Sequence, residues 1–286
     1  MVGYTIGDAL REGIALLNEV NMETASLDAR ILICHVLGCD SLYLTLHRDE
    51  PMAEEAQNTY FDYISRRRSN EPVSYITGTK EFMSLEFKVT PDVLIPRPDT
   101  EILVEKVISE AKDIPCPHII DMCTGSGAIA VSLSRYIEGS RVTALDISLS
   151  ALEIAKLNAE SNGADVKFEL HDAYKPYCAK ADVLVSNPPY IPTEDISELE
   201  TNVAGYEPHL ALDGGSDGLG FYRAITENAP HCLKSGGILA FEVGMGQADD
   251  VEMIMKPLFE NITRAKDLAG IERVVCGYLR SDTKLL

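Results

Sequence analysis

Two kinds of hydrophobic pattern divide the chain. Through residue 78, apolar residues recur every three to four positions, as at Ile6, Leu10, Ile14 and Leu17, which is the period of an amphipathic helix. Thr5 stands where a helix cap is expected. Further helices are predicted at 26–37, 53–68 and 73–76. The pattern predicts a small helical domain.

From residue 118 onward, short apolar runs alternate with segments of helical period. Strands are expected at 118–122, 141–146, 166–170, 181–186, 237–243, 261–266 and 272–279, and helices near 127–137, 149–161, 218–233 and 246–258. This alternation indicates βαβ units and a doubly wound, mostly parallel sheet of α/β class. No clear helix separates the last two strands, so we expect an antiparallel hairpin at the sheet edge.

The segment between these patterns is predicted as a hairpin linker over residues 79–95, because 82–89 resembles a short hairpin and 93–95 an extended stretch before Pro96. A helix is expected to start at Pro98. The predicted domains are therefore 1–78, helical, and 96–286, α/β. Residues 191–217 contain no predicted regular element, and long ordered loops are usually functional.

Charge and composition narrow the classes of function. Acidic residues outnumber basic ones by 45 to 25, a net charge of −20, which disfavours a large nucleic-acid footprint. The compact basic run 66–68 is best interpreted as a solvated helix end, with a local contact to an acidic partner as the alternative. Seven cysteines show no zinc spacing, so no metal site is predicted. We find no bilayer-length apolar run and no signal-like N-terminus, and we expect a cytoplasmic protein.

The segment Asn187-Pro188-Pro189-Tyr190 directly follows the apolar run 181–186. Two consecutive prolines cannot continue a strand ladder, so the chain must leave the sheet at Asn187. An amide side chain, carbonyl groups and an aromatic ring then emerge at the carboxyl end of a strand, where open α/β sheets bind ligands. Such a corner suits a planar amide or amino group about to be alkylated, although a plain proline-rich turn is the simpler interpretation of the motif alone.

Two other strand ends complete a candidate binding site. A glycine-containing turn, Cys123-Thr124-Gly125-Ser126-Gly127, follows the first strand and can approach a ligand closely. Asp146 ends the second strand, 19 residues beyond Gly127, where a carboxylate can accept hydrogen bonds from ribose hydroxyls. After the third strand, Asp172 can meet an adenine amino group, or it can simply cap its own loop.

The third glycine of the dinucleotide fingerprint is missing, since Ala130 stands in its place, and no second phosphate-binding motif is present. This favours S-adenosylmethionine over a dinucleotide. Its amino-acid end would occupy the glycine turn, its ribose would reach Asp146, and its methyl group would point toward Asn187.

Nearly the whole chain resembles the PrmC/HemK family of release-factor glutamine methyltransferases. The segments that carry this resemblance are Arg66–Arg68, Glu71-Pro72, Tyr75–Gly78, Glu81-Phe82 with Leu85, Leu94–Glu101, residues 121–130, Ser186–Ile191, Tyr206–Pro208, Leu212–Gly218, Glu242–Gly244 and Gly246-Gln247. The helical domain and the stretch 95–101 distinguish this family from other amino-methylating enzymes that share the NPPY corner. Departures are Met122-Cys123, where the family usually has Leu-Gly, and Ala173, where an adenine-stacking aromatic is common and for which Tyr174 is a substitute.

The resemblance implies a class I methyltransferase fold of seven strands, with S-adenosylmethionine as cofactor and S-adenosylhomocysteine as product. It implies methylation of the side-chain amide nitrogen of the glutamine in the Gly-Gly-Gln motif of peptide-chain release factors. The implied catalytic residues are Asn187, Pro188, Pro189 and Tyr190, and the implied cofactor-binding residues are 123–127, Asp146, Asp172, Ala173 and Asn187.

In this interpretation the Asn187 side-chain oxygen and the Pro188 carbonyl hold the two N–H groups of the substrate amide, and Tyr190 packs on its plane. The helical domain and the 191–217 loop would shape the release-factor surface, and we expect a monomer that binds neither nucleic acid nor membrane. Two alternatives remain open at this point. Adenine-N6 methylation of DNA or RNA would use the same corner, and a non-catalytic adaptor would bind cofactor or release factor without turnover.

Overall fold

The computed structural model describes residues 4–281 and contains two compact units. One unit comprises the chain up to Gly78 together with Glu200–Tyr206, and the other comprises Thr79–Leu199 together with the chain from Glu207 onward. Within residues 4–281, no helix has the length and apolar character needed to cross a membrane.

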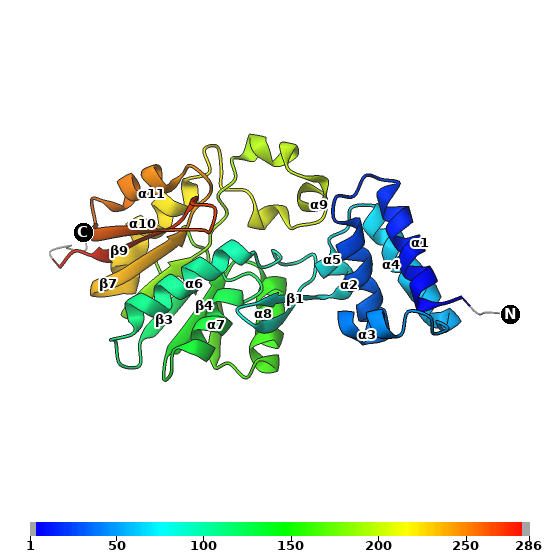
Figure 1. Ribbon diagram of the computed structural model, residues 1–286. Coiled ribbons are helices and arrows are strands. Elements are labelled where there is room, and N and C mark those ends of the chain that lie inside the picture. Colours follow the sequence, from blue (N-terminus) through cyan, green and yellow to red (C-terminus); the bar gives the residue numbers. More distant parts are fainter. Residues whose placement is uncertain (1–3, 282–286) are drawn as a thin grey trace. The chain divides into compact units, whose positions relative to one another are not determined.

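The first unit is helical, as predicted, and its part up to Gly78 is drawn in blue to cyan in Figure 1. Its helices are α1 (Ile6–Asn18), α2 (Ala25–Leu37), α3 (Ser41–Leu46), α4 (Glu54–Arg68) and α5 (Val73–Thr77). The cap predicted at Thr5 is a capping box, in which the Thr5 hydroxyl accepts the Asp8 N–H and the Asp8 carboxylate accepts the Thr5 N–H. α3 was not predicted, because six residues are too few to display a helical period.

The core of this unit surrounds Tyr60 of α4, which is fully buried against apolar residues of α1 and α2. Gly13 allows this approach, because a Cβ at that position would lie 2.1 Å from the Tyr60 hydroxyl oxygen. The short helix α9 (Thr201–Ala204) also belongs to this unit, where the Tyr206 hydroxyl donates a 2.7 Å hydrogen bond to the Ser69 carbonyl.

The second unit contains a seven-stranded sheet in the order β5-β4-β3-β6-β7-β9-β8. The strands are β3 (His118–Met122), β4 (Arg141–Asp146), β5 (Val166–Leu170), β6 (Ala181–Ser186), β7 (Leu233–Glu242), β8 (Phe259–Lys266) and β9 (Glu272–Leu279). The strand β9 runs antiparallel to both of its neighbours, β7 and β8, and β8 forms the edge of the sheet. The predicted doubly wound sheet with an antiparallel edge hairpin is confirmed.

Helices cover both faces of this sheet (Figure 1). The helices α6 (Pro98–Ala111), α7 (Ala128–Tyr136) and α8 (Leu149–Ser161) pack on one face, and α10 (Gly220–Cys232) and α11 (Ala248–Met255) pack on the other. Successive strand residues alternate between two cores, so that Ile119 and Val185 face α6 and α7 whereas Ile120 and Leu184 face α10. Burial on both faces explains why central strands such as β3 and β6 are largely apolar.

The segment predicted as a linker, 79–95, lies within the second unit. Its hairpin consists of β1 (Thr79–Phe82) and β2 (Leu85–Lys88), which begins three residues earlier than predicted. Phe82 and Phe87 are fully buried in the same core as α6, and the Asn158 side chain of α8 bonds both the N–H and the carbonyl of Lys88. The hairpin is therefore part of the α/β unit, because its two aromatic rings complete that core.

The loop at 191–217 contains short regular elements where none were predicted. These are η1 (Thr193–Glu198), α9 and η2 (His209–Ala211), and prolines precede η1 and η2 at positions 192 and 208. Single turns give no periodic signal, which is why the sequence pattern missed them. The base of the loop is closed, since the Gly214 N–H donates to the Ile191 carbonyl and the Ile191 N–H donates to the Leu212 carbonyl.

Candidate active site

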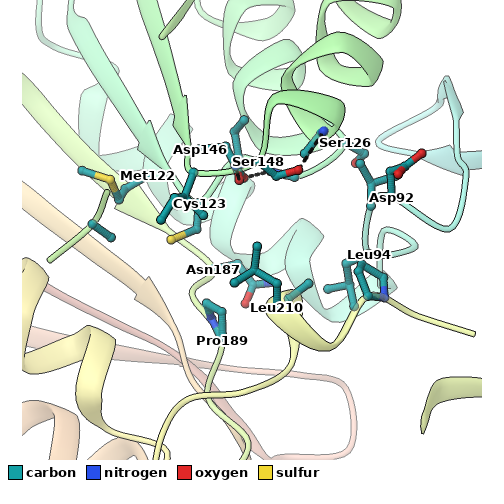
Figure 2. Close-up of a pocket in the computed structure, with 18 of the residues that line it drawn as sticks. Asp92, Leu94, Met122, Cys123, Ser126, Asp146, Ser148, Asn187, Pro189 and Leu210 are labelled. Atoms are coloured by element: carbon teal, nitrogen blue, oxygen red, sulfur yellow. Dashed lines mark hydrogen bonds between the residues drawn. The ribbon is translucent and has the colours of Figure 1, made fainter. Parts of the chain in front are cut away.

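The carboxyl ends of the parallel strands meet at one edge of the sheet. Met122 of β3 lies opposite both Leu145 of β4 and Ser186 of β6, and Ser186 lies opposite Phe241 of β7. The strand order reverses direction between β3 and β6, and such a switch point opens a crevice. A cavity of about 380 Å³ lies there (Figure 2), within the size range of small-molecule sites.

The glycine turn forms one wall of this cavity. Gly125 has a φ of +54°, and a Cβ placed there would meet no atom within 4 Å, so the backbone is open to the cavity. Gly127 has a φ of +80° and begins α7, and a Cβ there would lie 3.0 Å from that of Ala155. Gly127 does not line the cavity. The lack of a side chain at Gly127 allows α7 to pack against α8, whereas the lack of a side chain at Gly125 permits close approach of a ligand.

Asp146 supports that turn. Its carboxylate accepts hydrogen bonds from the backbone N–H of Gly125 and of Ser148, both at 2.9 Å, and the second of these is drawn in Figure 2. Burial raises the pKa of Asp146, and the backbone hydrogen bonds oppose this. Each carboxylate oxygen has a second lone pair, so Asp146 can accept ribose hydroxyls while it holds the turn.

Asp121, in β3 two residues before the turn, is fully buried and accepts a 2.5 Å hydrogen bond from the Thr124 hydroxyl. Burial is the main cause that raises the pKa of Asp121 to about 7. Asp121 therefore stabilises the turn through Thr124, which lines the cavity, and does not line the cavity itself.

Asp172 and Ala173, in the loop after β5, also line the cavity. Asp172 caps its own loop by accepting the Tyr174 N–H at 3.0 Å, and its second oxygen lies 3.4 Å from the Lys175 ammonium. The Tyr174 ring packs on the ring of Phe221 with centroids 4.9 Å apart, and both residues line the cavity. Aromatic surface therefore stands beside Ala173, where the sequence lacked it.

The NPPY corner lies at the end of β6. Asn187 and Pro189 line the cavity, and the Asn187 amide nitrogen donates a 3.3 Å hydrogen bond to the Thr100 hydroxyl at the start of α6. The Tyr190 ring is not among the cavity-lining residues. It packs beside Gly244, and the Gln247 amide donates to its carbonyl at 2.9 Å. Burial raises the pKa of Tyr190 to about 12, so its hydroxyl stays neutral.

Several lining residues were not singled out as site residues from the sequence. They are Leu94, Arg97, Thr100, Met122, Ser148, Pro208, Leu210 and Phe221. Arg97 makes an ion pair with Glu207, in which both carboxylate oxygens accept from the same guanidinium nitrogen, Nη2, at 2.7 and 2.8 Å. This ion pair holds Pro208 and Leu210 at the cavity. In the sequence, Leu94, Arg97, Thr100 and Pro208 stood out only because they lie in segments 94–101 and 206–208, which resemble the family. That resemblance did not assign a role to any single residue of these segments.

Comparisons with known proteins place these features in context. The family model described as the PrmC N-terminal domain matches residues 8–78, and the model described as the methyltransferase small domain matches residues 98–204. A release factor glutamine methyltransferase of Clostridium acetobutylicum is 42% identical, over 94% of this chain and 97% of that protein. One of Geobacter sulfurreducens is 41% identical, over 96% of each chain.

A solved structure, the hMettl16 catalytic domain in complex with MAT2A 3′UTR hairpin 6, is also similar. It has a TM-score of 0.56 at 13% identity and covers 82% of this chain and 84% of that one. At that identity the likeness concerns the fold alone.

Proposed function

This chain belongs to the release factor glutamine methyltransferases, a family of S-adenosylmethionine-dependent enzymes, and we propose that it methylates the side-chain amide nitrogen of the Gly-Gly-Gln glutamine in peptide-chain release factors. The observation that carries the proposal is the gathering of three strand ends around one cavity, with the glycine turn, Asp146 and Asn187 all in its wall. The remaining question is how these residues perform the transfer.

The cavity fits S-adenosylmethionine, which supplies an electrophilic methyl group on a sulfonium. Gly125 offers a wall of backbone without a side chain, and Asp146 offers carboxylate lone pairs to a ribose. Asp172, Ala173 and Phe221 form the part that receives a flat heterocycle. Cys123, Thr124 and Ser126 complete the turn, and Gly127 contributes through the packing of α7.

The NPPY corner holds the nucleophile. An amide nitrogen is a poor nucleophile because its lone pair is delocalised into the carbonyl group. The Asn187 oxygen and the Pro188 carbonyl accept its two N–H groups, fix the nitrogen in line with the methyl carbon and disfavour full conjugation. Positioning of this kind lowers a barrier by as much as ~7–11 kcal/mol.

Tyr190 supports this geometry from outside the cavity, whereas Pro189 forms part of the cavity wall. The Tyr190 ring is packed beside Gly244 and its carbonyl is held by Gln247, so it fixes the path of the backbone as the chain leaves β6. We propose this supporting role for Tyr190 in place of stacking on the substrate amide. After transfer, the extra proton on the nitrogen is acidic and leaves to water, so no general base is assigned.

The proposal extends to partners and location. We propose that the helical unit, residues 1–78, recognises the release factor and that residues 96–286 perform the chemistry, with the 79–95 hairpin as part of the catalytic unit. The net charge of −20 supports a protein partner over a nucleic acid. The proposal also places the chain, as a monomer, in the cytoplasm, where release factors act on ribosomes.

The test is incubation of the chain with labelled S-adenosylmethionine and one of three acceptors. The acceptors are an intact release factor, the same factor with its Gly-Gly-Gln changed to Gly-Gly-Ala, and DNA. We expect label on the intact factor alone, whereas label on DNA or on the Gly-Gly-Ala factor would overturn the proposal.

The matched variant is Asn187→Ala. Asn187 touches the reacting nitrogen but contributes little to holding the cofactor, so the variant is expected to bind S-adenosylmethionine as the unchanged chain does and to lose transfer by ~100-fold or more. Calorimetry and the label assay measure the two properties separately. Retained transfer, or a loss of cofactor affinity large enough to account for the loss of transfer, would contradict the assignment.

A further inference from the structure

Glu242 is a buried acid beside the NPPY corner to which no role has been given above. It is the last residue of β7. Because Phe241 lies opposite Ser186 in the parallel register, the next residues along the two strands, Glu242 and Asn187, are neighbours at the same edge. Glu242 is 3% exposed, and its Oε2 has no hydrogen-bond partner within residues 4–281.

The polar groups around Glu242 come from every element packed against it. Thr100 and Asn187 face its carboxylate as hydrogen-bond donors. Asp99 of α6, Arg273 of β9, Tyr190 and Tyr222 interact with it electrostatically. Arg273 is not its dedicated partner, since Arg273 forms ion pairs with Asp99 at 2.9 Å and Asp267 at 3.0 Å. The side-chain donors that lower the pKa of Glu242 are therefore Thr100 and Asn187.

This arrangement selects one orientation of the Asn187 amide. An ionised carboxylate only accepts hydrogen bonds, so it requires the NH2 end of Asn187 to face it. The Thr100 hydroxyl accepts from the same NH2 group at 3.3 Å. The oxygen of Asn187 is then directed away from both and is free for the substrate. A protonated carboxyl group also donates, so it loses this selectivity.

We propose that Glu242 is a positioning residue, which, given the proposed methyl transfer to a glutamine amide, keeps the Asn187 oxygen turned toward the substrate nitrogen. Glu242 acts through Asn187 and touches neither cofactor nor substrate. Its burial makes the interaction strong, because a hydrogen bond to an ionised carboxylate is weakened less in a protein interior than in water.

The proposal predicts a pH dependence. Burial is the largest cause that raises the pKa of Glu242 to about 7, and the hydrogen bond from Thr100, the charge of Arg273 and the hydrogen bond from Asn187 oppose it. Above that pH the carboxylate is ionised and Asn187 is held. As the pH falls through about 7, Glu242 takes up a proton and turnover declines.

The test uses the full chain and the variant Glu242→Gln, which keeps the volume but never ionises. Turnover of intact release factor at saturating S-adenosylmethionine is measured from about pH 5.5 to about pH 9, which spans about 1.5–2 units on either side of the expected midpoint. Cofactor affinity is measured by calorimetry. We expect the unchanged chain to lose kcat on the acid side. The variant should lack that limb, run ~10-fold or more below the unchanged chain at high pH, and bind cofactor equally well.

A second variant, Thr100→Val, keeps the test decisive if Glu242→Gln does not fold. It removes a donor that lowers the pKa of Glu242, so the acid limb should move to higher pH. The control is Thr226→Val in α10, which also removes a buried hydroxyl. Unlike that of Thr100, the Thr226 hydroxyl has no hydrogen-bond partner within residues 4–281, so this variant should leave the pH profile of turnover unchanged.

The outcomes separate this inference from the function on which it rests. If the unchanged chain does not label the release factor, the proposed function fails. If the unchanged chain works but Glu242→Gln keeps both its rate and its acid limb, only the role of Glu242 is overturned. A loss of cofactor affinity equal to the loss of rate would also overturn it, because that pattern marks a residue that merely supports the fold.

Discussion

Asp146 belongs both to the glycine turn and to the wall of the cavity that we propose as the cofactor site. It holds the Gly125 and Ser148 N–H groups and also lines the cavity. In Asp146→Asn, one carboxylate oxygen becomes an NH2 group that faces a backbone N–H, so one of these bonds is lost along with the charge. We expect S-adenosylmethionine affinity to fall by ~10–100-fold, as for loss of one or two hydrogen bonds to a charged group.

Calorimetric titration with S-adenosylmethionine measures that change. The matched control is Asp113→Asn, which removes an exposed acid from the segment after α6 and should leave affinity unchanged. If both variants bind the cofactor equally well, Asp146 does not serve the cofactor and only caps the turn.

At the scale of elements, the Arg97–Glu207 ion pair connects the 191–217 loop to the start of α6. The Glu207 side chain is 1% exposed and that of Arg97 is 37% exposed. Arg97→Ala leaves a buried carboxylate without a partner, whereas Glu207→Gln keeps an acceptor for Arg97 and removes the charge. We therefore expect Arg97→Ala to lower the free energy of unfolding by roughly 1–3 kcal/mol, a value reduced for the exposure of Arg97, and Glu207→Gln to cost less.

The cost of Arg97→Ala should depend on pH in a defined direction. Burial raises the pKa of Glu207, and Arg97 opposes that rise. Without Arg97 the native state holds a proton on Glu207 more tightly than the unfolded chain does, so stability falls as the pH rises above the unfolded-state pKa. Urea unfolding should give a larger loss at pH 8 than at pH 5, two points chosen to lie above and near the ordinary glutamate pKa of ~4.3. Equal losses at both would show that Glu207 stays ionised without Arg97.

The elements differ in how far the sequence could predict them. Strands buried on both faces, such as β3 and β6, were predicted to the residue because their apolar runs are bounded by polar or turn residues. α3 and η2 were missed because one or two turns carry no period. The β1–β2 hairpin was placed outside the catalytic unit, because the sequence does not reveal that Phe82 and Phe87 fill the core beside α6.

The site residues also differ in how far the sequence could predict them. The residues at strand ends, Asp146 and Asn187, were predictable because parallel strands present their carboxyl ends at one edge. Arg97 and Glu207 lie 110 positions apart, and Glu242 meets Asn187 only through the register of β6 and β7. Pairings of that kind come from the tertiary fold and leave no local pattern in the chain.

For the whole molecule, each compact unit has a core of its own. The helical core surrounds Tyr60, and the two cores of the α/β unit lie on the faces of its sheet. All residues that line the cavity belong to the α/β unit. Replacing residues 1–78 with an unrelated helical domain should therefore leave S-adenosylmethionine affinity unchanged. We expect methylation of intact release factor to fall by ~100-fold or more, as when an interface loses its main binding contacts.

Two further measurements make this exchange decisive. A short Gly-Gly-Gln peptide should be methylated at similar rates by the exchanged and unchanged chains, since it needs only the cavity. The exchange also removes the hydrogen bond from Tyr206 to the Ser69 carbonyl. Tyr206→Phe is the control for its loss and should retain activity on intact release factor. Equal methylation of intact factor by the exchanged and unchanged chains would refute recognition by the helical unit, and would assign substrate choice to the 191–217 loop and the cavity rim.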